Sequence, residues 1–564
     1  MYFGSFKSAI ALALLSGYAV AAEPGAAFTP AEQAAASRVT AEEISAPIRF
    51  LADDLLEGRF PGTRGSELAI RYLASELEGM GVEPGAVARG AGPPSFFQEV
   101  PLLRVVSTPP EEVVFRRGPE SLSLPTGPGT EAGVVVRSLA GAGRVDIEGA
   151  ELVFAGYGIV APEHGWDDYR GLDVRGKVVV LLNMNPPFAG EGVRLWYGRW
   201  DYKFLEAARH GAAGALLVHT VESASYPWQV VTASNGRVGF RLADDPEPWL
   251  PFQGWIARGA AEALFRLAGK DLVAEEAAAK DERRRGSGGV PLGVRLSLHM
   301  PVAEERVLSA NVVGRVPGTD PALRGEGVVF TAHHDHLGVR SPPVPGERNV
   351  YAGALDNASG CATLLAVARA AAAAPPRRSL YFVFPTAEEQ GLLGSRFFAR
   401  HPPLPAGRIA ADLNVDVVNH LGRASDLTVV GLGKSTLDPV LAAVAAAQGR
   451  TVHGDTFPDR GSFYRSDHFE LARVGVPAVS LRGGPTYPGR PAGWGKERQD
   501  EYVARDYHQT SDTYPPSPAS WDLAGAVDDA RLMLVAGLRL ANAPALPAWK
   551  RGDEFERARL EAPR

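Results

Sequence analysis

The sequence predicts an α/β protein with a mixed central sheet flanked by helices and a small β-rich insertion. Between residues 311 and 540, apolar runs rich in β-branched and aromatic residues alternate with helical patterns, as in a sheet covered by helices. Between about residues 122 and 280, short β-rich runs separated by glycine turns break this pattern. The length of 564 residues also suggests more than one domain.

The first 22 residues are typical of a secretory signal peptide. Lys7 precedes an apolar run over residues 9–15, and small residues over 19–22 suit cleavage before Glu23. An uncleaved anchor is the alternative interpretation. No later stretch approaches about 20 uninterrupted apolar residues, so no stable membrane anchor is expected in the mature protein. The sequence therefore predicts a secreted or periplasmic protein.

The overall composition is that of an ordinary globular protein, with 45% hydrophobic and 22% charged residues. The formal net charge is -7 and there is no long basic run, so nucleic acid is not an expected partner. The single cysteine, Cys361, excludes an intramolecular disulfide bond. A core of this size does not need one.

Residues 23–121 are expected to form the first part of the main domain. Residues 48–65 lead into a helix over residues 67–77, whose apolar residues suit one helical face. Gly79 and Gly81 are typical stop signals for that helix. Arg59, in the connecting segment, has two interpretations, a pocket contact and a structural turn.

Residues 122–285 are predicted to form the β-rich insertion, which includes one helix. None of its residues forms a catalytic set, so we expect it to select substrates rather than to carry chemistry. Residues 283–289 are charged and then glycine-rich, and they are predicted to be a linker back to the main domain.

Residues 286–545 are predicted to complete the main domain. Further helices are expected over residues 362–374, 439–448 and 522–540, and strands over residues 409–418 and 478–482. A long loop is predicted over residues 483–505, where it would shape the mouth of a site. The charged tail, residues 546–564, is expected to pack only through Trp549 and Phe555.

Histidines and carboxylates gather where the predicted strands end, which is where ligands bind in open α/β sheets. They occur in blocks at residues 330–338, 353–360, 384–391, 414–416 and 506–513. Imidazole and carboxylate groups are the usual ligands of zinc and similar divalent ions. On an extended strand His333 and Asp335 would share a face, so that Asp335 could orient His333 as a metal ligand.

In their order and residues, these blocks resemble those of the dizinc aminopeptidase family, which is related to bacterial leucyl aminopeptidase, glutamate carboxypeptidase II and the transferrin receptor. In this chain they read Ala-His-His-Asp, Gly-Ala-Leu-Asp-Asn-Ala-Ser-Gly, Glu-Glu-Gln-Gly-Leu-Leu-Gly-Ser, Asn-Val-Asp and Tyr-His-Gln-Thr-Ser-Asp-Thr. The insertion resembles the protease-associated domain found in many members. The resemblance covers nearly all of the mature chain and implies the zinc exopeptidase fold.

The resemblance implies two Zn²⁺ ions per chain. His333, Asp356 and Asp416 would hold one ion. Asp356, Glu389 and His508 would hold the other, so that Asp356 bridges the two. The family pattern also implies a cis peptide bond after Asp356, a costly backbone state that is found at functional sites.

The same resemblance assigns roles to the neighbouring residues. Glu388 would be the general base, beside the ions but not bound to them. Tyr507 is a candidate hydrogen-bond donor to the oxyanion. Asp335 and Asp512 would contact and orient the metal ligands without binding an ion themselves.

Other residues of these blocks have simpler interpretations. His334 and His336 are possible ligands by composition alone, but the family pattern favours the first histidine of the run. Asp467 and His468 are expected to form a pocket wall or to support the ligands. Cys361 is expected to be a small buried residue at the start of a helix rather than a nucleophile.

Taken together, the residues and the resemblance predict a secreted zinc aminopeptidase that acts on peptide substrates. Three alternatives stay open. A carboxypeptidase of the glutamate carboxypeptidase type shares the same metal set. A glutaminyl cyclase has the same fold but typically uses one zinc ion, and a receptor-like binding protein would be expected to lack ligands. The sequence does not indicate the oligomeric state.

Overall fold

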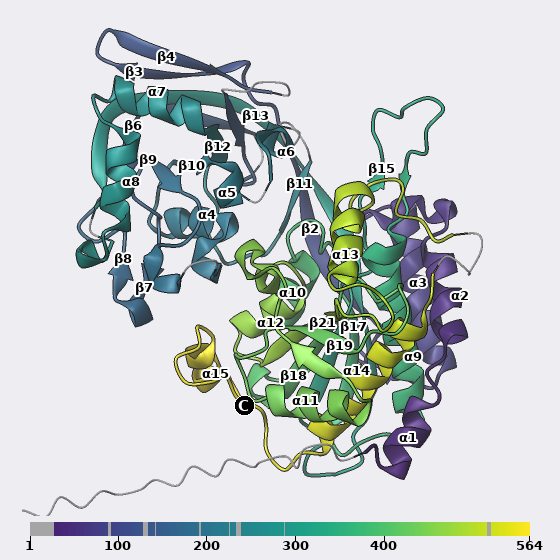
Figure 1. The fold of residues 1–564 in the computed structure, drawn as a ribbon. Helices are drawn as coiled ribbons and strands as arrows, with labels where there is room; N and C mark the ends of the chain where they lie inside the picture. The colour runs from purple at the N-terminus through teal and green to yellow at the C-terminus, as the bar shows by residue number, and fades with distance from the viewer. Residues whose placement is uncertain are drawn as a thin grey trace, which may run out of the picture.

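The computed structural model describes residues 27–87, 92–127, 133–141, 143–190, 193–224, 226–232, 238–286, 288–515 and 521–564. The predicted signal peptide, residues 1–22, therefore lies outside the described residues. Figure 1 shows a larger part, in which helices cover a sheet, and a smaller part at upper left, with strand β13 (Val290–Val316) running between them.

The larger part is built on a mixed sheet, as predicted. Three parallel strand pairs form its centre, and antiparallel pairs flank them. The strand order is β13, β17 (Ser379–Phe384), β14 (Gly327–Thr331), β18 (Ile409–Val415), β21 (Ala478–Gly483), β19 (Asp426–Val430) and β20 (Thr451–His453). Short strand β1 (Glu83–Pro84) adds to β13, and β15 (Gly338–Val339) pairs with β16 (Val350–Tyr351).

Helices cover both faces of this sheet because successive strand residues point to opposite sides. Val328 and Phe330 of β14 join one buried cluster, and Val329 joins another. The helices on the first face are α1 (Pro30–Ala36), α2 (Ala41–Leu51), α3 (Arg64–Gly79), α9 (Ser359–Ala372), α11 (Asp438–Ala447) and α14 (Ala524–Asn542). On the second face lie α10 (Leu393–Arg400) and α12 (His468–Arg473).

The smaller part has its own buried core, which runs from Leu103 to Val302 in sequence. Its strands are β2 (Phe97–Ser107), β3 (Glu112–Arg117), β4 (Glu120–Pro125), β5 (Val134–Arg137), β6 (Gly143–Phe154), β7 (Val160–Ala161), β8 (Trp166–Asp167), β9 (Val178–Leu182), β10 (Gly214–His219), β11 (Gly239–Leu242) and β12 (Phe252–Ala257). Its helices are α4 (Trp200–Arg209), α5 (Val221–Ala224), α6 (Trp228–Thr232), α7 (Arg258–Leu267) and α8 (Leu272–Lys280). This part is β-rich, as predicted, and the domain boundaries at residues 122 and 285 stay predictions.

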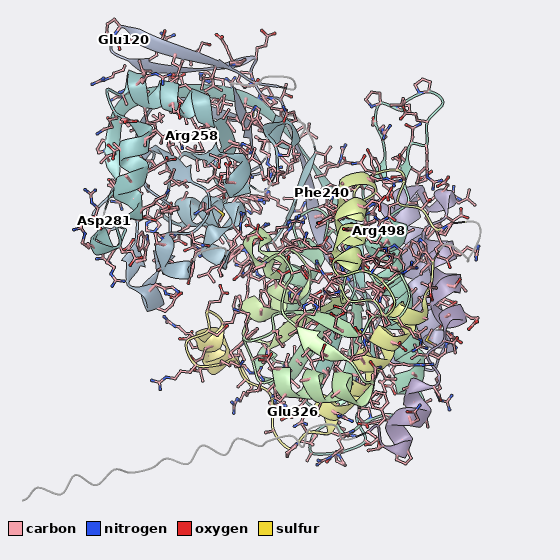
Figure 2. All side chains as sticks on the ribbon, in the orientation of Figure 1. Glu120, Phe240, Arg258, Asp281, Glu326 and Arg498 are labelled. Atoms are coloured by element: carbon pink, nitrogen blue, oxygen red, sulfur yellow. The ribbon has the colours of Figure 1, made fainter. Side chains whose placement is uncertain are left out.

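The two parts meet along β2, β11 and β13. Figure 2 shows Phe240 of β11 between them, Glu120 at the outer edge of the smaller part and Glu326 at the opposite end of the larger part. Phe240 is buried together with Leu393 and Phe397 of the larger part. An apolar contact of this kind, beside the shared strands, fixes the smaller part against one edge of the larger sheet.

One predicted element is wrong and another is confirmed only in part. The segment predicted as a long loop, residues 483–505, ends in helix α13 (Trp494–Arg505). The tail packs through Trp549 and Phe555, each 5% exposed, as predicted. It does not pack only through them, because Arg559 donates to the carbonyl oxygens of Ala406 and Ile409, and Glu554 pairs with Lys434. The tail also contains a short helix, α15 (Glu556–Glu561). Among the described residues, no helix is long and apolar enough to cross a membrane.

Candidate metal centre

The candidate ligands lie at the carboxyl ends of parallel strands. His333 follows β14 by two residues, Glu388 and Glu389 follow β17, and Asp416 comes directly after β18. Asp356 stands in a turn that leads into α9, and its peptide bond to Asn357 is cis, as the family pattern implies. Neighbouring parallel strands end at the same edge of the sheet, which is why residues more than 80 positions apart meet here.

A first cluster surrounds the ring of His333, which is 1% exposed. Its Nε2 atom lies 3.3 Å from Oδ1 of Asp356 and 3.3 Å from Oδ1 of Asp416. These three residues offer ligand atoms within 4.8 Å of one another, a spacing that suits one metal ion. They are the three residues that the sequence assigns to the first ion.

A second cluster forms on the other oxygen of Asp356. Nε2 of His508 lies 3.2 Å from Oδ2 of Asp356 and 3.0 Å from Oε2 of Glu389. A further histidine, His336, which the family pattern did not favour as a ligand, also lies here, and its Nδ1 is 2.7 Å from Oε1 of Glu389. His336, Asp356 and Glu389 also offer ligand atoms within 4.8 Å of one another. Asp356 therefore faces both clusters, one with each carboxylate oxygen.

The position of His336 follows from where β14 ends. The expectation that His333 and Asp335 share a strand face is wrong, because the strand stops at Thr331 and residues 332–337 are irregular. In this segment His333 and His336 both reach the centre. The sequence signal for His336 is its place in the histidine-rich run, three residues after His333.

The two predicted supporting carboxylates act mainly on backbone groups. Oδ1 of Asp335 accepts a hydrogen bond from the backbone N–H of Glu388 at 3.0 Å, and it lies 3.8 Å from Nδ1 of His333. Asp512 accepts hydrogen bonds from the backbone N–H groups of Leu355 and Asp356. Both carboxylates are buried and fix the chain segments that carry the cluster.

Glu388 stands beside the clusters without belonging to either. Its Oε2 lies 3.8 Å from Nε2 of His333, and the side chain is 9% exposed. Burial, together with the charges of Glu389 and Asp416, raises the pKa of Glu388 well above its ordinary value, although the His333 charge opposes this. A carboxyl group with a raised pKa is suited to accept and return a proton near neutral pH.

The clusters hold strongly ionised groups in a buried site. Burial opposes ionisation of Asp356, yet its contacts with His333 and His508 lower its pKa well below the ordinary value. Burial likewise opposes ionisation of Glu389, but His508 and His336 together lower its pKa to about 2. Burial lowers the pKa of His333, but the charge of Glu388 and the contacts with Asp356 and Asp416 together outweigh burial, so the net pKa is raised.

The donor set fits divalent metal ions. It consists of imidazole nitrogens and carboxylate oxygens, the groups that bind zinc in proteins, and the pKa values of Asp356 and Glu389 lie below their ordinary values. Burial lowers the pKa of His333 and of His508, but the surrounding carboxylates outweigh burial and raise both, so both rings favour the protonated form. Metal binding requires neutral imidazole and therefore releases these protons.

Three other residues have structural positions, as the simpler interpretations expected. Nε2 of His334 lies 3.1 Å from the carbonyl oxygen of Ala310, away from both clusters. Cys361 is fully buried, and burial raises the pKa of its thiol to about 12, which does not suit a nucleophile. Arg59 is 1% exposed and donates to backbone carbonyls, so it forms a structural turn rather than a pocket contact.

Two pockets flank the clusters. The first, of about 380 Å³, lies between the larger and smaller parts and includes Glu388 and Glu389; we call it the insert-side pocket. The second, of about 220 Å³, includes Asp416; we call it the Asp416-side pocket. Tyr507 and Arg465 line both pockets. Burial raises the pKa of Tyr507 to about 12, so its hydroxyl keeps its proton at neutral pH.

Comparison with protein families gives a match to "Peptidase family M28" over residues 311–535. Among solved structures, an aminopeptidase from Aneurinibacillus sp. strain AM-1 is 20% identical, with a TM-score of 0.48, over 91% of this chain and 97% of that chain. The zinc aminopeptidase BSAP from Bacillus subtilis is 16% identical, with a TM-score of 0.40, over 89% and 95%. A peptidase M28 precursor from Shewanella amazonensis SB2B is 17% identical, with a TM-score of 0.41, over 92% and 97%. The comparison with curated proteins gave no match.

Proposed function

We propose that this protein, whose residues 311–535 match the model of peptidase family M28, is a secreted or periplasmic dizinc aminopeptidase. The observation that carries the proposal is that Asp356 faces two donor clusters, one with each carboxylate oxygen, while Glu388 stands beside both. This arrangement has room for two ions and a separate proton carrier.

The ligands of the first ion would be His333, Asp356 and Asp416, and those of the second would be Asp356, Glu389 and His508. Two divalent ions held there would supply Lewis acidity to a scissile carbonyl and would lower the pKa of a bound water to about 7. Every other step belongs to side chains of the chain itself.

Glu388 takes the proton of the attacking water and returns it to the departing amine. Its raised pKa suits this role, because a carboxylate with an ordinary pKa would be a weaker base and would take the proton of the water poorly. Tyr507 keeps its phenolic proton and lines both pockets, so it is placed to donate a hydrogen bond to the oxyanion that forms between them.

We propose an aminopeptidase ahead of a carboxypeptidase because the motifs of this chain resemble those of the dizinc aminopeptidases. The metal set itself is common to both activities. The smaller Asp416-side pocket has room for one side chain, which suits removal of a single residue.

The test is cleavage of one neutral peptide with a free amino terminus and of the same peptide acetylated, with zinc supplied and products identified by mass. Stepwise loss of residues from the free peptide alone supports the proposal. Loss from the carboxyl end of the acetylated peptide would instead establish a carboxypeptidase. As a control, a chelator should abolish the activity and added zinc should restore it.

A further inference from the structure

The two pockets would bind the parts of a peptide that lie on opposite sides of the scissile bond. This assignment rests on the proposed function, in which Glu388 returns a proton to the leaving amine. Glu388 lines the insert-side pocket and not the Asp416-side pocket, so the leaving fragment lies in the insert-side pocket. The terminal residue that is removed then occupies the smaller Asp416-side pocket.

Most charged groups of the insert-side pocket neutralise one another. Nη2 of Arg396 lies 3.1 Å from Oε1 of Glu470, and Nη2 of Arg473 lies 2.7 Å from Oε1 of Glu247. Nη1 of Arg400 lies 2.6 Å from Oδ1 of Asp245. The carboxylates Asp245 and Glu247, which line the pocket, are therefore already paired with arginines of the larger part.

Arg137 is an exception. This residue ends strand β5, lines the insert-side pocket and is half-buried. It forms no ion pair with any residue that the structure describes. Its Nε and Nη2 atoms each lie 3.2 Å from the amide oxygen of Gln253, in the amide orientation that satisfies both groups. Burial lowers the pKa of Arg137 below its ordinary value, so an anion at this position would stabilise its charged form.

Arg199 also lines this pocket and offers further donors. Its side chain is 13% exposed, and its Nε lies 3.4 Å from Oδ1 of Asp201. This contact is not aligned as a hydrogen bond, and within the described ranges Nε has no hydrogen-bond partner. The smaller part therefore brings to the pocket two guanidinium groups with spare N–H donors.

We propose that the insert-side pocket selects leaving fragments that carry a carboxylate, which Arg137 and Arg199 bind. A guanidinium group pairs with a carboxylate through two parallel hydrogen bonds, an arrangement that also fixes orientation. The carboxylate comes either from an acidic side chain next to the scissile bond or from the free carboxyl terminus of a short peptide. On this view the insertion sets the specificity of a centre to which it supplies no metal ligand.

The test compares kcat/KM for matched peptides with zinc supplied. Leu-Glu-amide against Leu-Gln-amide isolates the side-chain carboxylate, and Leu-Gly-Gly against its amide isolates the terminal one. We expect the acidic member of at least one pair to have a kcat/KM about tenfold higher, as a charged hydrogen-bonded pair provides. The pair that shows the preference identifies the source of the carboxylate.

Arg137→Gln should remove that preference by lowering kcat/KM for the acidic peptide towards that of its neutral partner. Arg175→Gln is the matched control, because Arg175 is an exposed arginine of the smaller part outside the pocket, and it should keep the preference. Equal kcat/KM values within both pairs, or a preference that survives Arg137→Gln, would overturn the proposal.

A binding measurement separates this proposal from the proposed function. The same peptides are titrated into zinc-loaded Glu388→Gln protein, in which turnover is suppressed, and the Kd is measured by calorimetry. Tighter binding of the acidic peptides that is lost in the Glu388→Gln, Arg137→Gln double variant supports the pocket even if the reaction were different. Cleavage of neutral and acidic peptides at equal rates, with equal Kd values, refutes the pocket and leaves the aminopeptidase standing.

Discussion

Oδ2 of Asp512 accepts a hydrogen bond from the backbone N–H of Asp356 at 3.1 Å. Its other oxygen accepts one from the backbone N–H of Leu355 at 2.9 Å, and the hydroxyl of Tyr502 donates to the same carboxylate. The turn that carries the bridging candidate is thus held by a residue 156 positions away in the sequence. Its orientation between the two clusters does not depend on the turn alone.

Replacing Asp356 by Ala should lower the affinity for both metal ions together, because one side chain faces both clusters. The measurement is a zinc titration that follows both binding steps. Asp173→Ala, at an exposed position of the smaller part, is the control and should bind two ions normally. One ion still bound at full strength in Asp356→Ala would exclude bridging.

Glu388→Gln should keep both ions and lose about 100- to 10,000-fold in kcat, since the substitution removes the proton carrier and no ligand. Metal analysis and steady-state kinetics on the same preparation check the two halves of this expectation. Turnover within a few fold of the wild type would remove Glu388 from the role of general base.

His336→Gln should weaken one metal ion by about 10- to 100-fold and leave the other in place, because Nδ1 of His336 contacts Glu389 and not Asp416. His334→Gln is the matched control in the same histidine-rich run, since its Nε2 faces the carbonyl oxygen of Ala310. If both variants bound zinc like the wild type, His336 would have no part in the centre.

Arg59→Met should lower the free energy of unfolding by about 3 to 5 kcal/mol. Nε of Arg59 donates to the carbonyl of His334 at 2.8 Å, and its Nη2 donates to that of Gly353 at 3.0 Å. The substitution leaves these buried acceptors without partners. Arg71→Met, on the exposed face of α3, should change the same quantity by less than about 0.5 kcal/mol in urea unfolding.

Acidification should destabilise the protein partly through His468. Burial, with a smaller contribution from the Arg482 charge, lowers the pKa of this fully buried ring to about 3, whereas an unfolded histidine titrates near 6.5. Between these values only the unfolded state takes up the proton. The contribution of His468 to the free energy of unfolding is therefore fully present above about pH 6.5 and is lost as the pH falls towards 3.

From pH 7 to pH 5, this one histidine should account for about 2 kcal/mol of lost stability. Asp467 and other buried acids also titrate, so the quantity to measure is the difference between wild type and His468→Leu in urea unfolding at the two pH values. A difference that stays constant between pH 7 and pH 5 would show that His468 does not titrate differently on unfolding.

Much of the fold was predictable because the larger part obeys simple periodicity. Apolar runs such as residues 379–384 became fully buried strands, and the segment over 522–540 became α14 (Ala524–Asn542). Helix α13 was missed for a physical reason. Gly495 is its only buried residue, so it lacks the apolar stripe from which an amphipathic helix is recognised.

At the site, sequence order was enough to bring the predicted ligands together, because the motifs follow strands whose ends meet. Periodicity failed just beyond those ends. His336 would point away from His333 on a regular strand, yet the strand stops at Thr331 and the irregular segment turns both rings inwards. That Arg137 has no ion-pair partner among the described residues was also beyond sequence reasoning, since it depends on which acidic groups the fold leaves out of reach.

Strand β13 determines how the width of the insert-side pocket, between the larger and smaller parts, can change. It pairs with β6 and β3 in the smaller part, with β2 over residues 302–312, and then with β17 in the larger sheet. A connection of this kind cannot swing like a flexible tether, because each step of rotation must bend or twist a continuous hydrogen-bonded ladder. The insert-side pocket should therefore open by elastic bending of the strands through small angles. The strands should then restore its resting width without any separate closing contact.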